Sequence, residues 1–208
     1  MGGLEGPRDR HAMTSGEPEP IRAFLALDLP LEQREALFAV ASRLKRAGAR
    51  VSWVTPDRMH LTLRFLGEVA PDALEQLGDD LAPVYARQDP FPLTLAHIGA
   101  FPNVRAPRVV WAGLSPLEGP LAACQQAAET AARSIGLKAE TKAFKPHVTL
   151  GRIRDPKTAG KLTGPLTDEQ DFHGGEFEAG HVSLYASELT SSGPRYTQLR
   201  VFPFSWNS

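Results

Sequence analysis

Two short phrases in the sequence carry the same pair of polar side chains. Residues 60–63 read HLTL and residues 147–150 read HVTL, so each phrase places an imidazole two residues before a hydroxyl. On a β-strand, successive side chains point to opposite faces. The His and the Thr of each phrase therefore share one face of a strand, and the two aliphatic side chains anchor the other face.

Two imidazoles that face each other across a cleft suit an in-line displacement at phosphorus. The attacking water must lose a proton on one side of phosphorus, and the leaving oxygen must gain one on the other side. Because the usual pKa of histidine is near 6.5, one of His60 and His147 can be neutral while the other is protonated. The hydroxyls of Thr62 and Thr149 can donate hydrogen bonds to the non-bridging oxygens as charge develops there. This chemistry needs no metal ion.

Two other interpretations compete with a catalytic pair. Half-buried strands favour Thr and Leu, and the phrase HVSL at residues 181–184 shows that similar letters also arise elsewhere in this chain. A metal site is the second rival, but each phrase supplies one imidazole, and no Cys or carboxylate stands at a zinc-binding spacing. Because the two copies occur in matching contexts, we favour the catalytic pair and predict neither a metal nor a cofactor.

The stretches around the two phrases predict a repeating order of strands and helices. Short apolar or alternating runs indicate strands, and apolar residues spaced three and four apart indicate helices. The predicted strands cover residues 21–30, 51–55, 60–69, 90–102, 108–114, 146–153, 180–189 and 195–204, and the predicted helices cover residues 31–50, 71–88 and 116–136. Residues 155–175 read as a long polar loop, and the last two strands read as a hairpin.

This order of elements predicts an α+β fold. We expect two similar lobes related by a pseudo-twofold axis, each a mainly antiparallel sheet backed by helices. The active-site cleft then lies between the lobes, where the two His-x-Thr strands can meet.

Length and composition are those of an ordinary globular chain. The 208 residues suit a single bilobal domain, which we place at residues 21–208. Residues 1–20 are polar and rich in Gly and Pro, without the apolar centre of a secretory signal, and we predict a disordered extension there. The single cysteine, Cys124, excludes an internal disulfide framework and fits a reducing compartment. We expect a cytoplasmic protein and a monomer.

The charge and hydropathy of the chain limit its partners. A net charge of −1 provides no strong general attraction for nucleic acid or for a membrane surface. No apolar run reaches the roughly 18 residues of a membrane span. The near-neutral charge favours contact with a terminus or a few nucleotides over binding of a long duplex.

A series of phrases resembles the RNA 2′,3′-cyclic phosphodiesterases, the bacterial and archaeal enzymes once called 2′-5′ RNA ligases. This family belongs to the two-histidine (2H) phosphoesterase superfamily, and the resemblance covers roughly residues 21–204. The phrases, in family order, are RAFLALDLP, WVTPDRMHLTLRFLGEV, IGAFP, PRVVWAGL, FKPHVTLGRI and SLYASELTSSGPRYTQL. The resemblance implies a bilobal α+β fold in which the two motif strands line a central cleft.

The resemblance also implies a reaction and the roles of its residues. The family opens a 2′,3′-cyclic phosphate at an RNA end to give a 2′-phosphomonoester, so the 3′ oxygen leaves. Carried over to this chain, His60 is the proton donor to the leaving group and His147 activates water. The same site can run in reverse and join RNA ends through a 2′-5′ linkage.

Three further residues are candidates for substrate contact. Arg152 follows the second motif as in the family, where a basic residue contacts the nucleotide, but it reaches the cleft only if the strand ends or bulges near Gly151. Arg64 has the parity of the first His and Thr, so it can touch phosphate or be a solvated strand residue. Phe24, on the first strand, can stack a base or fill the core.

Alternative functions remain open from the sequence. The cleft can belong to a non-catalytic module that binds RNA ends or nucleotides, although binding alone does not need two proton carriers. The same chemistry can also act on small cyclic nucleotides or on linear 2′-5′ oligonucleotides. The expected partner is RNA with a 2′,3′-cyclic phosphate terminus, or a nucleotide, and not a membrane.

Overall fold

The computed structural model describes residues 18–191 and 193–206. Most of the predicted disordered extension, residues 1–17, lies outside the described residues, and residues 18–20 lead into the first strand without regular structure. The elements are β1 (Ile21–Asp28), α1 (Leu31–Lys45), β2 (Val51–Trp53), η1 (Pro56–Arg58), β3 (His60–Val69), α2 (Pro71–Tyr85), β4 (Phe91–Phe101), β5 (Val109–Ser115), α3 (Pro120–Ser134), β6 (His147–Ile153), η2 (Pro156–Leu162), α4 (Thr163–Asp168), β7 (His173–Ala179), β8 (His181–Thr190) and β9 (Gly193–Pro203).

The described strands form one curled antiparallel sheet made of two similar halves. The strand order is β7-β4-β5-β6-β3-β1-β8-β9, and β2 pairs with β6 off this path. Along this path, four strands lie on each side of the junction between β6 and β3, where Leu61 pairs with Val148. The predicted bilobal α+β fold is confirmed, with the two half-sheets joined at the strands that carry the motifs.

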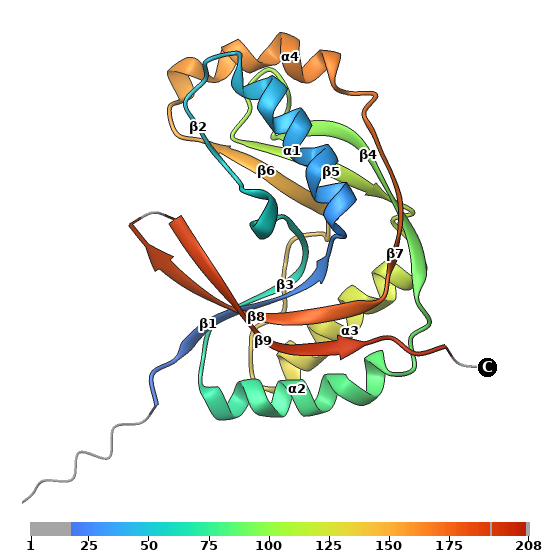
Figure 1. Cartoon of the computed structure of the whole chain (residues 1–208). Helices are drawn as coiled ribbons and strands as arrows, with labels where there is room; N and C mark the ends of the chain where they lie inside the picture. The colour runs from blue at the N-terminus through green and yellow to red at the C-terminus, as the bar shows by residue number, and fades with distance from the viewer. Residues whose placement is uncertain (1–17, 192, 207–208) are drawn as a thin grey trace, which may run out of the picture.

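Each half-sheet is covered by helices that partly come from the other half of the chain (Figure 1). Helices α2 and α3 pack together and contact β3, β8 and β9, although α3 follows β5 in the sequence. Helix α1 follows β1 but contacts β6 and β7, in the opposite half. This exchange ties the two lobes together and leaves their motif strands side by side.

The prediction of a long polar loop at residues 155–175 is wrong. Asp155 accepts a hydrogen bond from the backbone N–H of Lys157 and so begins a helical segment that continues through η2 and α4. Leu162 and Leu166 are both fully buried and lie four residues apart, which fixes one helical face against the core. The many Gly, Pro and Thr residues hid this short apolar pattern.

Both motif strands contain a β-bulge at the leucine that ends the motif. The pairing with the neighbouring strand skips one residue there, Leu63 in β3 and Leu150 in β6. An extra residue reverses the alternation of side chains beyond it. The bulges therefore turn Phe65 and Arg152 to the face of the histidines, and turn Arg64 to the opposite face.

Candidate active site

The two motif histidines are held in the same way by their own strands. His60 Nδ1 donates to the carbonyl oxygen of Arg58 at 2.9 Å, and His147 Nδ1 donates to the carbonyl oxygen of Lys145 at 2.6 Å. A carbonyl oxygen only accepts, so the Nδ1 proton stays in place. The Nε2 atom of each ring is left to exchange a proton with a ligand.

The aliphatic residues of the motifs anchor the site from behind, as the sequence predicts. Leu61, Leu63, Val148 and Leu150 are at most 3% exposed. Their burial in the core fixes the strands, and the His and Thr side chains lie half-buried on the other face. Since β3 and β6 pair between these residues, one rigid sheet carries both motifs.

Aromatic rings fix the orientation of both imidazoles. The ring of His60 stacks on Phe24 with centroids 4.7 Å apart, and Tyr196 meets it edge-on at 5.4 Å. Phe101 meets the ring of His147 edge-on at 5.0 Å. Phe24 is only 2% exposed, so its ring is covered and cannot stack a base. This corrects the expectation of a base-stacking Phe24, which instead supports His60.

Burial lowers the pKa of His60 below its usual value near 6.5. The Arg58 carbonyl and the nearby carboxylate of Asp28 act against burial and raise the pKa, while the neighbouring His147 lowers it further. The effect of His147 on the pKa of His60 indicates that the two imidazoles lie close enough to interact electrostatically.

The pKa of His147 is also lowered, mainly by burial. The Lys145 carbonyl raises it, and the positive charge of Arg152 lowers it. Arg152 is exposed and lies on the face of the histidines because of the bulge at Leu150. The bulge near Gly151 that Arg152 needs in order to reach the cleft is therefore present. The contact of Arg152 with substrate stays a prediction.

The motif threonines lie beside the histidines. Thr62 and Thr149 are half-buried on the same face as the imidazoles of their own strands. Trp111 on β5 pairs directly with Thr149 and walls the site there. Within the described part of the chain, no side-chain hydrogen bond occupies either hydroxyl. Both are therefore available to donate to a bound anion.

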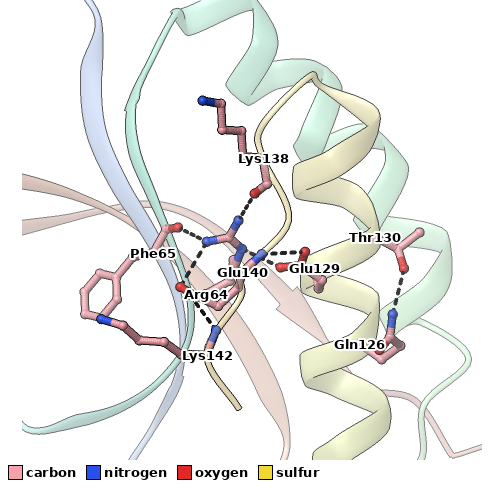
Figure 2. Close-up of polar contacts among 8 residues, drawn as sticks. All are labelled: Arg64, Phe65, Gln126, Glu129, Thr130, Lys138, Glu140 and Lys142. Atoms are coloured by element: carbon pink, nitrogen blue, oxygen red, sulfur yellow. Dashed lines mark hydrogen bonds and ion pairs between the residues drawn. The ribbon is translucent and has the colours of Figure 1, made fainter. Parts of the chain in front are cut away.

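Arg64 lies away from the cleft, contrary to the parity expected from its sequence position. It is 9% exposed, and its Nε atom lies 2.6 Å from Glu129 Oε2 on α3. Figure 2 shows its guanidinium also donating to the carbonyl oxygens of Lys138 and Phe65, at 2.6 and 2.8 Å. The expectation that Arg64 touches phosphate is wrong, because the bulge at Leu63 turns it under α3.

A hydrogen-bonded carboxylate beside His60 was not predicted from the sequence. Asp28 pairs directly with His60 across β1 and β3. Its carboxylate accepts hydrogen bonds from His181 Nε2 at 2.9 Å, Ser183 Oγ at 2.6 Å and Tyr185 OH at 2.8 Å. The signal was the alternation of three polar residues along β8: His181 and Ser183 inside the HVSL phrase, and Tyr185 directly after it.

A pocket of about 300 Å³ opens next to His60. Its walls come from the end of β1, from α1, from η1 and from the β8–β9 hairpin. The lining residues are Asp28, Leu29, Arg34, Asp57, Met59, His60, Tyr185 and Tyr196. A ligand at His60 is therefore surrounded by aromatic and ionisable side chains.

In residues 18–191 and 193–206, no three His, Cys, Asp or Glu side chains gather in a way that could hold a metal ion. None of the helices described is long and apolar enough to cross a membrane.

Comparison with known proteins agrees with this site. A family model described as LigT-like phosphoesterase matches residues 27–111 and 114–196, and each segment contains one motif. A protein of Methanothermobacter thermautotrophicus named RNA 2′,3′-cyclic phosphodiesterase is 34% identical over 182 residues, which are 88% of this chain and 98% of that protein. The Escherichia coli protein of the same name is 34% identical over 184 residues, with 88% and 96% covered.

Solved structures show the same architecture. The crystal structure of Escherichia coli LigT complexed with 3′-AMP is 29% identical, with a TM-score of 0.71 over 90% of this chain and all of that chain. The complex of the same protein with phosphate has the same TM-score and identity, over 91% of this chain. The family resemblance read from the sequence is confirmed, and the chain belongs to the LigT-like phosphoesterase family.

Proposed function

We propose that this protein hydrolyses the 2′,3′-cyclic phosphate at RNA ends to a 2′-phosphomonoester, without a metal ion. The observation that carries the proposal is the pair of imidazoles on the adjoining strands β3 and β6. Each ring has its Nδ1 bonded to backbone and its Nε2 left for proton exchange. The names of the relatives supply the substrate, and the 3′-AMP and phosphate complexes of LigT show that this fold takes such ligands.

The reaction needs one proton donor and one proton acceptor. Water attacks phosphorus in line with the 3′ oxygen, so one P–O bond forms as the P–O3′ bond breaks. His147 takes the proton from water, and His60 gives its proton to the departing O3′. The positive charge of Arg152 beside His147 disfavours a second cation there, which supports His147 as the neutral base.

The remaining residues of the site stabilise the phosphate. Thr62 and Thr149 donate hydrogen bonds to the non-bridging oxygens as their charge grows in the transition state. Arg152 contacts the nucleotide from the exposed rim of the cleft. By microscopic reversibility, the same groups can join RNA ends through a 2′-5′ linkage. A monomeric state and a cytoplasmic location remain predictions from the sequence.

The decisive test is the product formed from an oligonucleotide that ends in a 2′,3′-cyclic phosphate, in excess EDTA. We expect a 2′-phosphate end, and a 3′-phosphate or no turnover contradicts the proposal. Binding of the oligonucleotide without turnover would favour the alternative of a binding module. Faster turnover of small cyclic nucleotides or linear 2′-5′ oligonucleotides would favour the other alternative.

Variants of the two histidines test their roles. His60→Ala and His147→Ala should each lower kcat by roughly 10²- to 10⁴-fold, the usual contribution of a general acid or base. The matched control is His173→Ala, because His173 is exposed on β7, at the edge of the sheet and away from β3 and β6. It should keep wild-type activity.

A further inference from the structure

The pseudo-symmetry of the active site is broken at one position of each half. In the first half, Asp28 on β1 pairs directly with His60. In the second half, the residue that pairs with His147 is Gly113 on β5. A Cβ added to Gly113 would lie 2.9 Å from the backbone oxygen of Ala96, so that position excludes a carboxylate side chain. Of these two paired positions in the described chain, the one opposite His60 carries a carboxylate and the one opposite His147 does not.

Three donors keep the carboxylate of Asp28 in its charged form. Burial alone would raise the pKa of Asp28, but the hydrogen bonds from His181, Ser183 and Tyr185 outweigh burial and hold the pKa below its usual value. Gln198 in turn donates to Ser183 Oγ at 3.0 Å and steadies this arrangement. The negative charge is thus present throughout the pH range in which the histidines titrate.

Asp28 acts on His60 electrostatically and not through a hydrogen bond to Nδ1, because the Nδ1 proton of His60 is already donated to another acceptor. His60 Nδ1 donates to the carbonyl oxygen of Arg58. Tyr185, which donates to Asp28, packs on Phe24 at 5.4 Å, and Phe24 stacks on His60. The carboxylate and the imidazole line the same pocket and lie on the same face of the sheet.

Other ionisable groups face His60 from the surrounding elements. Arg34 on α1, Asp57 on η1 and Tyr196 on β9 line the same pocket, and His147 adjoins it on β6. Among the charged groups, Asp28 raises the pKa of His60 and His147 lowers it. Asp28 is distinguished from them by its place directly opposite His60 and by its three hydrogen-bond donors.

We propose that Asp28 is a positioning residue whose fixed negative charge keeps a proton on His60, and that this charge makes His60 the general acid. The proposal rests on the proposed function and explains why two similar motifs take different roles. An imidazolium beside a carboxylate is favoured, while His147 has the positive charge of Arg152 nearby and pairs with Gly113 instead of a carboxylate.

The pH–rate profile separates the two possible roles of His60. On the alkaline side both histidines are neutral, and kcat/KM is proportional to the fraction of the acid that keeps its proton. On the acidic side both are protonated, and kcat/KM is proportional to the fraction of the base that has lost its proton. A change in the pKa of His60 alone therefore alters the alkaline side if His60 is the acid, and the acidic side if it is the base.

The test compares Asp28→Asn with the wild-type protein over the whole profile. Asn keeps the shape of Asp and removes its charge, so we expect kcat/KM to fall about tenfold on the alkaline side and to stay unchanged on the acidic side. The expected fall reflects a lower pKa of His60 once the neighbouring negative charge is removed. Asp28→Glu keeps the charge and should retain most of the activity. The matched control, Glu68→Gln, removes an exposed charge from β3 and should not change the profile.

Three outcomes would overturn the proposal: an unchanged alkaline side, a rise of kcat/KM on the acidic side, or an equal loss at every pH. The last result would indicate a purely structural role. Folding is checked by circular dichroism, and Asp28→Ser replaces Asp28→Asn if the latter does not fold.

A measurement that needs no substrate keeps this inference separate from the proposed function. The histidine rings are titrated by NMR in the wild-type and Asp28→Asn proteins, and the titration of His181 is followed with them. We expect a lower pKa for His60 in the variant and little change for His147. Failure of the wild-type protein to open a cyclic phosphate would end the proposed function, whereas an unchanged His60 titration would end the role of Asp28.

Discussion

Replacing Arg64 tests the most direct consequence of the bulge in β3. The guanidinium lies under α3 beside Glu129, and the exposed fractions of the two side chains are 9% and 13%. Removing one partner of a buried ion pair costs about 3–5 kcal/mol, because the remaining charge stays buried and unpaired. For Arg64→Met we expect a loss near the lower end, about 3 kcal/mol, since Glu129 keeps some contact with water.

The loss of stability can be expressed as a melting temperature. An unfolding entropy of about 2.1 cal/mol/K per residue gives roughly 0.4 kcal/mol/K for this chain, so Tm should fall by about 7 °C. Well below Tm, kcat/KM should match the wild type because Arg64 lies on the face opposite the histidines. The assays are thermal unfolding followed by circular dichroism and hydrolysis of a cyclic-phosphate oligonucleotide.

Two further variants complete this test. Adding Glu129→Leu to Arg64→Met should restore most of the stability, because no unpaired charge then remains under α3. Arg152→Met, on the exposed cleft face, should raise KM several-fold and leave Tm nearly unchanged. If Arg64→Met raises KM while Tm stays constant, Arg64 acts on the substrate and is not the buried structural residue described above.

Four other predictions concern the site. Because the pKa values of His60 and His147 are both lowered, kcat/KM should be maximal below pH 6.5. The maximum of kcat should lie at a higher pH, because a bound phosphodiester anion favours imidazolium. A kcat/KM maximum above pH 7 would contradict this prediction. Stability should also fall as pH drops below about 6.5, because the unfolded imidazoles bind protons more readily, and denaturant unfolding at several pH values measures this. Thr62→Val and Thr149→Val should each lower kcat by about 10- to 100-fold in single-turnover assays, and wild-type rates would exclude hydrogen bonds to the phosphate. Phe24→Leu should lower kcat and leave KM unchanged, because the ring supports His60; a higher KM alone would restore the base-stacking role.

The amino-acid sequence by itself determined the motifs, the order of most elements and the family. The His and Thr positions are readable because alternation along a strand is a local property. The aliphatics at Leu61 and Val148 are readable for the same reason, and the structure buries both. The segment at 155–175 escaped prediction because Gly, Pro and Thr conceal the spacing of Leu162 and Leu166.

Tertiary structure alone decided which side chains beyond the motifs reach the cleft. A bulge depends on how two distant strands pair, and Leu63 and Leu150 look like ordinary strand residues in the sequence. Because of the bulges, Arg64 lies on the face opposite the histidines and Arg152 lies on their face, the reverse of what strict alternation predicts. The environment of Asp28 is also non-local, since its three donors lie more than 150 residues further along the chain. The repeated motif therefore predicts two equivalent histidines, and the folding of the chain makes their surroundings different.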